Sequence, residues 1–125
     1  MTNPSGICIL CIGSDPINLN LRCSRLKAFG WKVISSGSGY GGLFQFAKVP
    51  VDCVVLDLND RGEESALIAG QLKKQKPSLP VVMLVKSREG LSSGATDQAD
   101  VVVLKSEEKK ALLPHIQQLL NKTQA

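Results

Sequence analysis

The sequence predicts an α/β fold: one five-stranded parallel sheet with helices on both faces. Five short apolar runs recur at regular spacing along the 125 residues. Most of them are continuous in Val, Ile and Leu, which is typical of strands covered on both faces. The stretches between these runs have mostly helical patterns. Because strands and helices alternate, the expected sheet is parallel.

The apolar runs are the expected strands, taken here in chain order. They cover residues 7–12, 31–35, 52–58, 80–85 and 100–105. Right-handed crossover connections leave few topologies for five such strands, and we expect the flavodoxin-like order 2-1-3-4-5. In that order ligands bind at the carboxyl ends of the first and third strands. Those ends are the stretches 13–15 and 57–60.

The first helix has clear start and stop signals. Asp15 can cap its N-terminus, Pro16 suits its first turn, and Gly30 can end it. Apolar residues at spacings of three and four form its inner face: Leu19, Cys23, Leu26 and Phe29. We therefore expect this helix to follow the first strand directly.

The second and third helices are expected near residues 40–48 and 63–76. The second follows a glycine-rich stretch, 36–42, that lacks the Lys-Ser/Thr of a phosphate-binding loop. We interpret this stretch as a flexible loop rather than a nucleotide site. Pro77 should end the third helix.

The last two helical regions are less regular. Residues 87–98 contain two glycines and four Ser or Thr residues, so a short or irregular helix is expected. The final helix should begin near Ser106, with acidic residues at its positive end. Pro114 should either kink it or delay its start to near Ala111.

Length and composition indicate a single globular domain. We expect it to cover residues 6–121, with flexible tails at 1–5 and 122–125. No apolar run is long enough for a membrane helix, and the N-terminus lacks the pattern of a secretory signal, so a cytoplasmic protein is expected. The net charge of +4 is mild and its basic residues are dispersed, which argues against nucleic-acid binding.

The cysteines and the histidine give little support to metal or redox chemistry. Cys8 and Cys11 have CxxC spacing, but residues three apart in a strand point to opposite faces. We interpret them as small buried apolar residues. His115 is the only histidine, so neither a histidine metal cluster nor a Ser–His–Asp triad is expected.

Asp57 is the most informative residue. It closes the apolar run 52–57, at the edge of the sheet where the topology places a site. From the sequence alone it is either a loop cap or a functional group.

The stretch from Ile7 to Leu120 resembles a CheY-like response-regulator receiver domain. Four segments carry the resemblance, in order and at matching spacing: "ILCIGSDP", "DCVVLDL", "LPVVMLV" and "ADVVVLK". The resemblance implies that Asp57 accepts a phosphoryl group and that Lys105 pairs with it. It also implies an atypical member, because the family's acidic metal-binding pair falls on Gly13 and Ser14.

Two further positions depart from the family pattern. The hydroxyl that binds the phosphoryl group falls on Val85, and the aromatic switch residue falls on Val102. Valine can neither donate that hydrogen bond nor provide a ring. The resemblance therefore implies that both phosphorylation and its readout are impaired.

The remaining candidate Mg²⁺ ligands are few, so we expect Mg²⁺ to bind weakly at most and no other cofactor. They are Asp57, the carbonyl of Asn59 and, less directly, Asp15, which is one residue late and suited to capping. Lys86 is either a solvated loop residue or a cation that reaches Asp57. In the second case it would form a metal-free cluster with Lys105.

The expected function is that of an atypical receiver, a non-enzymatic two-component signalling module that acts through protein contacts. Its partner would be a histidine kinase or an output protein, bound on a face of helix 4, strand 5 and helix 5; a homodimer is also open. The alternative is a working phosphoacceptor, phosphorylated on Asp57 by a histidine kinase. A small-molecule sensor is a third class. Without a DNA-binding extension, direct transcriptional output is expected only if the chain is an excised domain.

Overall fold

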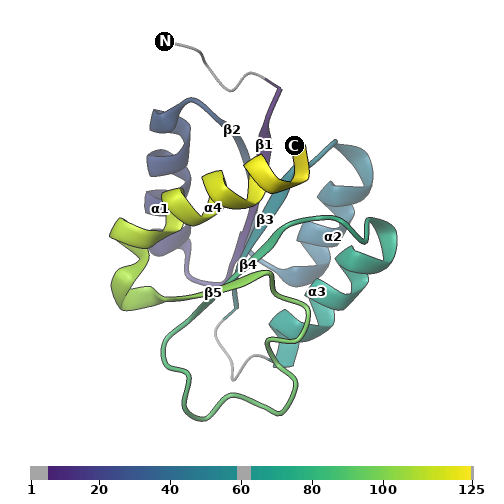
Figure 1. The fold of residues 1–125 in the computed structure, drawn as a ribbon, viewed down its shortest axis with the longest axis vertical. Coiled ribbons are helices and arrows are strands. Elements are labelled where there is room, and N and C mark those ends of the chain that lie inside the picture. The colour runs from purple at the N-terminus through teal and green to yellow at the C-terminus, as the bar shows by residue number, and fades with distance from the viewer. Residues whose placement is uncertain (1–5, 59–62, 125) are drawn as a thin grey trace.

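The structure is a computed structural model that describes residues 6–58 and 63–124. Its five parallel strands lie in the order β2-β1-β3-β4-β5, which confirms the predicted topology (Figure 1). The strands are β1 (Cys8–Gly13), β2 (Lys32–Ser36), β3 (Cys53–Asp57), β4 (Val81–Val85) and β5 (Val101–Leu104). The helices are α1 (Pro16–Phe29), α2 (Gly39–Lys48), α3 (Glu63–Gln75), the 3-10 helix η1 (Lys105–Glu107) and α4 (Glu108–Gln124).

Two apolar cores lie on the two faces of the sheet. Helices α1 and α4 cover one face, and α2 and α3 cover the other (Figure 1). Side chains of β1 alternate between them: Cys11 packs in the α1–α4 core, whereas Cys8 packs in the α2–α3 core. The prediction that these two cysteines point to opposite faces is therefore confirmed, and all four cysteines are free and buried.

Helix α1 begins and ends where the sequence predicts. The Asp15 carboxylate accepts a hydrogen bond from the backbone N–H of Ile17 at 3.0 Å, Pro16 occupies the first turn, and Gly30 ends the helix with φ of 116°. That φ is in the left-handed region, which glycine adopts without a steric penalty. These signals place the start of α1 directly after β1.

The segment 86–100 is fully described and contains turns and bends but no regular helix. The prediction of a short or irregular helix there was right only about the irregularity. Two positive-φ glycines, Gly90 and Gly94, interrupt the segment. Of the five expected helical regions, this one therefore forms no regular helix, and the expected partner face contains the 86–100 segment in place of the fourth expected helix.

Helix α4 follows the prediction in part. It begins at Glu108, directly after η1, which is close to the expected start near Ser106. Of the two alternatives given for Pro114, the late start near Ala111 is wrong, because Pro114 lies inside the helix. Pro114 is exposed, so the Lys110 carbonyl that it leaves without a helical N–H is on the solvent side, where water can bind it. The helix also continues to Gln124, where a flexible tail was expected from residue 122.

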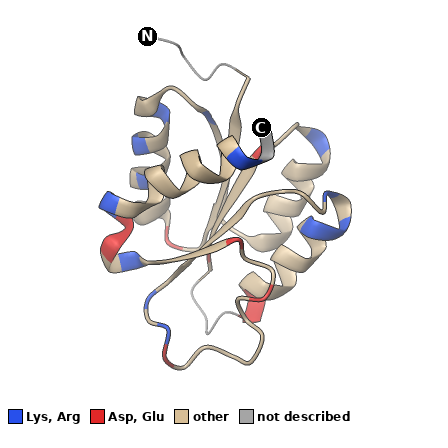
Figure 2. Ribbon diagram, in the orientation of Figure 1, with Lys and Arg blue, Asp and Glu red and all other residues tan. Residues whose placement is uncertain are grey.

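No helix within the described ranges, 6–58 and 63–124, has the length and apolar character needed to cross a membrane. Figure 2 shows described Lys and Arg residues on both helical layers and on the 86–100 segment.

Candidate functional site

Asp57 lies at the carboxyl end of β3, next to the end of β1. The sheet register places Gly13 directly beside it, and the Ser14 backbone N–H donates a hydrogen bond to the Asp57 carbonyl oxygen at 3.2 Å. The Asp57 side chain is only 2% exposed. A buried carboxylate is costly unless charged or hydrogen-bonding partners compensate it, so its neighbours determine its chemistry.

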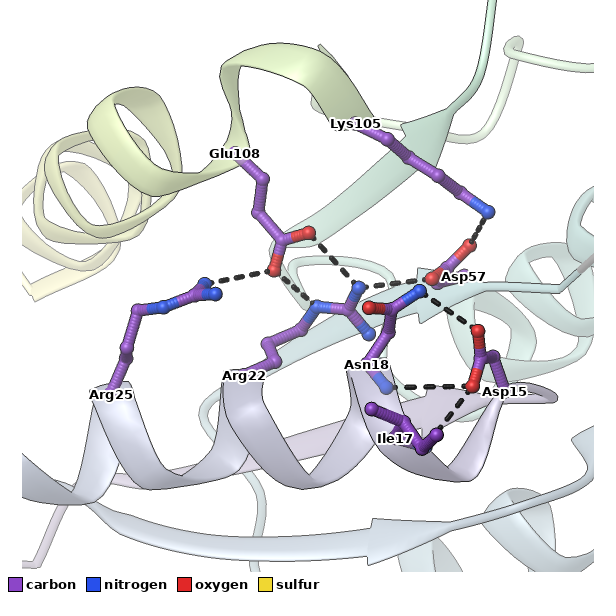
Figure 3. A network of polar contacts seen from close by, with 8 residues as sticks. All are labelled: Asp15, Ile17, Asn18, Arg22, Arg25, Asp57, Lys105 and Glu108. Carbon is purple, nitrogen blue, oxygen red and sulfur yellow. Dashed lines mark hydrogen bonds and ion pairs between the residues drawn. The ribbon is translucent and has the colours of Figure 1, made fainter.

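Two cations contact the Asp57 carboxylate, one on each oxygen (Figure 3). Arg22 Nη2, from α1, lies 2.9 Å from Oδ2. Lys105 Nζ, from the start of η1, lies 2.5 Å from Oδ1. The two contacts differ in exposure, because the side chain of Arg22 is 1% exposed and that of Lys105 is 26% exposed.

Arg22 is held in place by a second carboxylate. Its Nε lies 2.6 Å from Glu108 Oε2, and its Nη2 lies 3.0 Å from Glu108 Oε1. The planar guanidinium therefore makes a two-pronged contact with Glu108 and a single contact with Asp57 (Figure 3). Arg25, one turn later on α1, also contacts Glu108 Oε2, at 3.4 Å. This cluster joins α1, β3 and the first residue of α4.

The environment of Arg22 favours its charged form. Burial is the largest single influence and lowers the Arg22 pKa, but it is outweighed by Glu108, through its hydrogen bond and its charge, and by Asp57. The net effect raises the pKa of Arg22. The guanidinium is therefore a permanent cation in this site.

Arg22 was not among the predicted site residues, although its position in α1 carries a signal. Leu19, Cys23 and Leu26 form the buried face of α1, and position 22 falls between them on that same face. An arginine at a core-facing helix position must be paired with buried acceptors. The two carboxylates that pair with it come from residues 35 and 86 positions away, and no local pattern identifies them.

The structure brings Lys105 to Asp57 and leaves Lys86 exposed. Among the described residues, the ion pairs of Asp57 go to Arg22 and Lys105. Two cations therefore contact the Asp57 carboxylate, and Arg22 lies where a contact from Lys86 was considered. Arg22 reaches Asp57 because it lies on the buried face of α1. Lys86 lies just beyond the end of β4, and its side chain is exposed.

The other candidate metal ligands do not assemble. Asp15 uses Oδ1 to accept from the backbone of Ile17 and Oδ2 to accept from the side-chain amide of Asn18, at 2.9 Å. Asn59 lies outside the described residues. Val85 and Val102, at the positions of the family's hydroxyl and ring, are buried and half-buried apolar residues.

The described residues around Asp57 do not fit a Mg²⁺ ion. Within residues 6–58 and 63–124, no group of three or more His, Cys, Asp or Glu side chains is arranged to hold a metal. Both Asp57 oxygens face cations instead. Mg²⁺ requires oxygen ligands in octahedral geometry, and a neighbouring guanidinium and ammonium would repel it.

Known protein sequences resemble only part of the chain. No protein-family model matches it. Over 76 residues, 61% of its length, the chain is 30% identical to the transcriptional regulatory proteins GlrR of Escherichia coli K12 and QseF of Escherichia coli O157:H7. It spans 17% of the length of each of these two proteins.

Solved structures match far more of the chain. A CheY-like response regulator receiver domain protein from Methanospirillum hungatei has a TM-score of 0.83 at 20% identity, over 94% of this chain and 96% of that one. The response regulator TrrA of Thermotoga maritima, in complex with Mg²⁺-BeF, has a TM-score of 0.81 at 24% identity, over 90% of this chain and 98% of that one. In a complex of TrrA with the histidine kinase ThkA, the matched chain has a TM-score of 0.79 at 25% identity, over 91% of this chain and 98% of that one. The likeness therefore extends over the whole fold.

Proposed function

We propose that this chain, which has the CheY-like receiver fold, is a two-component signalling module that acts through protein–protein contacts. In this proposal Asp57 undergoes weak or no Mg²⁺-dependent phosphorylation. The observation that carries the proposal is the pairing of the buried Asp57 carboxylate with Arg22 and Lys105. The charge that a metal would otherwise balance is already balanced by the protein.

The proposed loss of phosphorylation follows from the demands of phosphoryl transfer. Catalysis of this step is mostly positioning and charge neutralisation, to which a metal ion contributes a large share. Gly13 and Ser14 provide no carboxylate beside Asp57, and Asp15 is engaged in capping α1. Attack by Asp57 Oδ2 would also require the Arg22 hydrogen bond, at 2.9 Å, to be given up.

The proposed partner is a histidine kinase or an output protein. The complex of TrrA with the histidine kinase ThkA supports a kinase partner, and the regulatory proteins GlrR and QseF support an output role. The proposed contact face consists of the 86–100 segment, β5 and α4, which replaces the face of helix 4, strand 5 and helix 5. We also propose that the chain is cytoplasmic. A homodimer through the same face is an alternative to a different partner.

A working phosphoacceptor is the second candidate, and one observation favours it. Lys105 contacts Asp57 at the carboxyl end of the sheet, where the resemblance places the lysine that pairs with the phosphoryl group. In this case a histidine kinase would phosphorylate Asp57 despite the neighbouring Arg22.

Intact-mass analysis after incubation with acetyl phosphate and Mg²⁺ separates the two candidates. The leading proposal expects little or no phosphoryl adduct on the wild-type chain under conditions that phosphorylate TrrA. An adduct that forms on the wild type to the same extent as on TrrA, and is absent from Asp57→Ala, would overturn it in favour of the phosphoacceptor. TrrA, treated in parallel, serves as the positive control for the phosphodonor.

A further inference from the structure

Arg22 lies between two carboxylates that come from different elements. The same atom, Nη2, is 2.9 Å from Asp57 Oδ2 and 3.0 Å from Glu108 Oε1. Oxygen anions on both sides of one point are the usual surroundings of a hard divalent cation. In this protein that point is occupied by a guanidinium nitrogen that is covalently part of α1.

Gly13 leaves room for that guanidinium. A Cβ at position 13 would lie 3.5 Å from Arg22 Nη1 and 3.4 Å from Leu19 Cδ1. A methyl group would fit at these distances, but any longer side chain would extend along the guanidinium. Nη1 is buried and has no hydrogen-bond partner among the described residues. An acceptor introduced at position 13 would therefore meet a charged, unsatisfied donor.

We infer that Arg22 is the resident cation of this site and that it excludes divalent cations from Asp57. The lack of a carboxylate at position 13 is then not sufficient to explain the loss of a metal site, because a restored carboxylate would pair with Arg22 Nη1. The inference rests on the proposed function, because both assume that no Mg²⁺ binds at Asp57. It adds that the Arg22 guanidinium is the cause of this lack of binding.

Binding of Mn²⁺, followed by the electron paramagnetic resonance signal of the free ion, tests this cause on four proteins. They are the wild type, Gly13→Asp, Gly13→Asp/Arg22→Met and the matched control Gly13→Asp/Arg25→Met. Arg25 also contacts Glu108 but is 39% exposed and does not contact Asp57 in the described structure. We expect only the Arg22 double variant to gain affinity, by at least about tenfold over Gly13→Asp, because removing a neighbouring cation relieves direct repulsion.

Equal Mn²⁺ affinities of Gly13→Asp and Gly13→Asp/Arg22→Met, including no binding by either, would overturn the inference. So would an equal gain in the Arg25 control. Far-ultraviolet circular dichroism checks that each variant is folded. If the methionine variant does not fold, Gly13→Asp/Arg22→Gln replaces it, since glutamine removes the charge but keeps an amide donor. The proposed function fails on a different result, phosphorylation of the wild type.

Discussion

Arg22 has the side chain that its position requires. Its guanidinium presents several N–H donors in one plane, so it can contact Glu108 through Nε and Nη2 while Nη2 also reaches Asp57. A lysine carries one ammonium and could not span both carboxylates in the same way. Each of the three charges is buried or nearly so. Removing Arg22 would leave Asp57 with Lys105 and Glu108 with Arg25, two cations that are more exposed than Arg22.

Replacing Arg22 with methionine is therefore expected to destabilise the fold strongly. Breaking a buried ion pair by removing one partner typically costs about 3–5 kcal/mol. Arg25→Met is the matched control and is expected to cost less than about 1 kcal/mol, because Arg25 is partly exposed. Urea unfolding of the two variants measures both free energies. A methionine at position 22 that costs no more than one at position 25 would contradict the importance of the Arg22 cluster.

At this scale the sequence predicted part of the site. Asp57 was visible from its local pattern, because it closes an apolar run, whereas Lys105 was identified through the resemblance to receiver domains. The structure brings the two together. Arg22 and Glu108 were not identified because their pairing is tertiary. Lys86 was considered as a partner of Asp57 because it directly follows Val85 at the end of a predicted strand. Its side chain is exposed in the structure, and no local pattern could show this.

At the scale of single elements, α4 tolerates a proline in its seventh position. Pro114 cannot donate the helical hydrogen bond to the Lys110 carbonyl, and its ring crowds the preceding turn. The proline alone therefore favours a late start of the helix, but packing outweighs it, because Leu112, Ile116 and Leu120 bury one face of α4. Burial of that face holds the helix together across the proline.

Pro114→Ala is expected to stabilise the protein by about 1–3 kcal/mol, because the lost hydrogen bond is restored on an exposed face. Gln118→Ala, at another exposed position of α4, is the control and should change stability by less than about 0.5 kcal/mol. Thermal or urea unfolding gives both values. Destabilisation by Pro114→Ala would show that the proline shapes α4 in a way that its neighbours require.

Two helical glycines should respond in opposite ways to alanine. A Cβ at Gly42 in α2 would overlap Ile12 Cδ1 and lie 2.6 Å from Ile12 Cγ1, whereas a Cβ at Gly70 in α3 meets nothing within 4 Å. Gly42→Ala should cost about 1–3 kcal/mol through overpacking. Gly70→Ala should gain about 0.5–1 kcal/mol through helix propensity. Urea unfolding compares them, and a stabilising Gly42→Ala would contradict the close approach of α2 to β1.

At the scale of the whole molecule, the sheet and most helices follow from the sequence. The five strands and the start of α1 were predicted because buried parallel strands and capping residues have strong local signals. The strand order followed from the few topologies that right-handed crossovers allow. The secondary structure of segment 86–100 could not be predicted from the sequence, because glycine and short polar residues favour no single structure. Only the fold of the chain shows that it crosses between β4 and β5 without a regular helix.

The free energy of unfolding should fall at alkaline pH because of a buried thiol in the central sheet. Burial raises the pKa of the Cys53 thiol to about 12, so the folded chain keeps this proton at pH values where the unfolded chain loses it. Stability is therefore full below the ordinary thiol pKa and falls as pH rises toward about 12, by about 1.4 kcal/mol per pH unit for this group. Urea unfolding at about pH 9 and pH 10 should show a smaller fall for Cys53→Ala than for the wild type. Identical falls would contradict the raised pKa.

The most direct test of the central claim, that Arg22 and Lys105 occupy Asp57 in place of a metal ion, is a Mn²⁺ titration of the ¹⁵N-labelled wild-type chain followed by NMR. Bound Mn²⁺ broadens the signals of nearby amides, and Gly13, Ser14 and Asp57 report on this position. We expect these signals to broaden no more than those of other amides with comparable exposure. Selective broadening of all three at low Mn²⁺ concentration would contradict the claim.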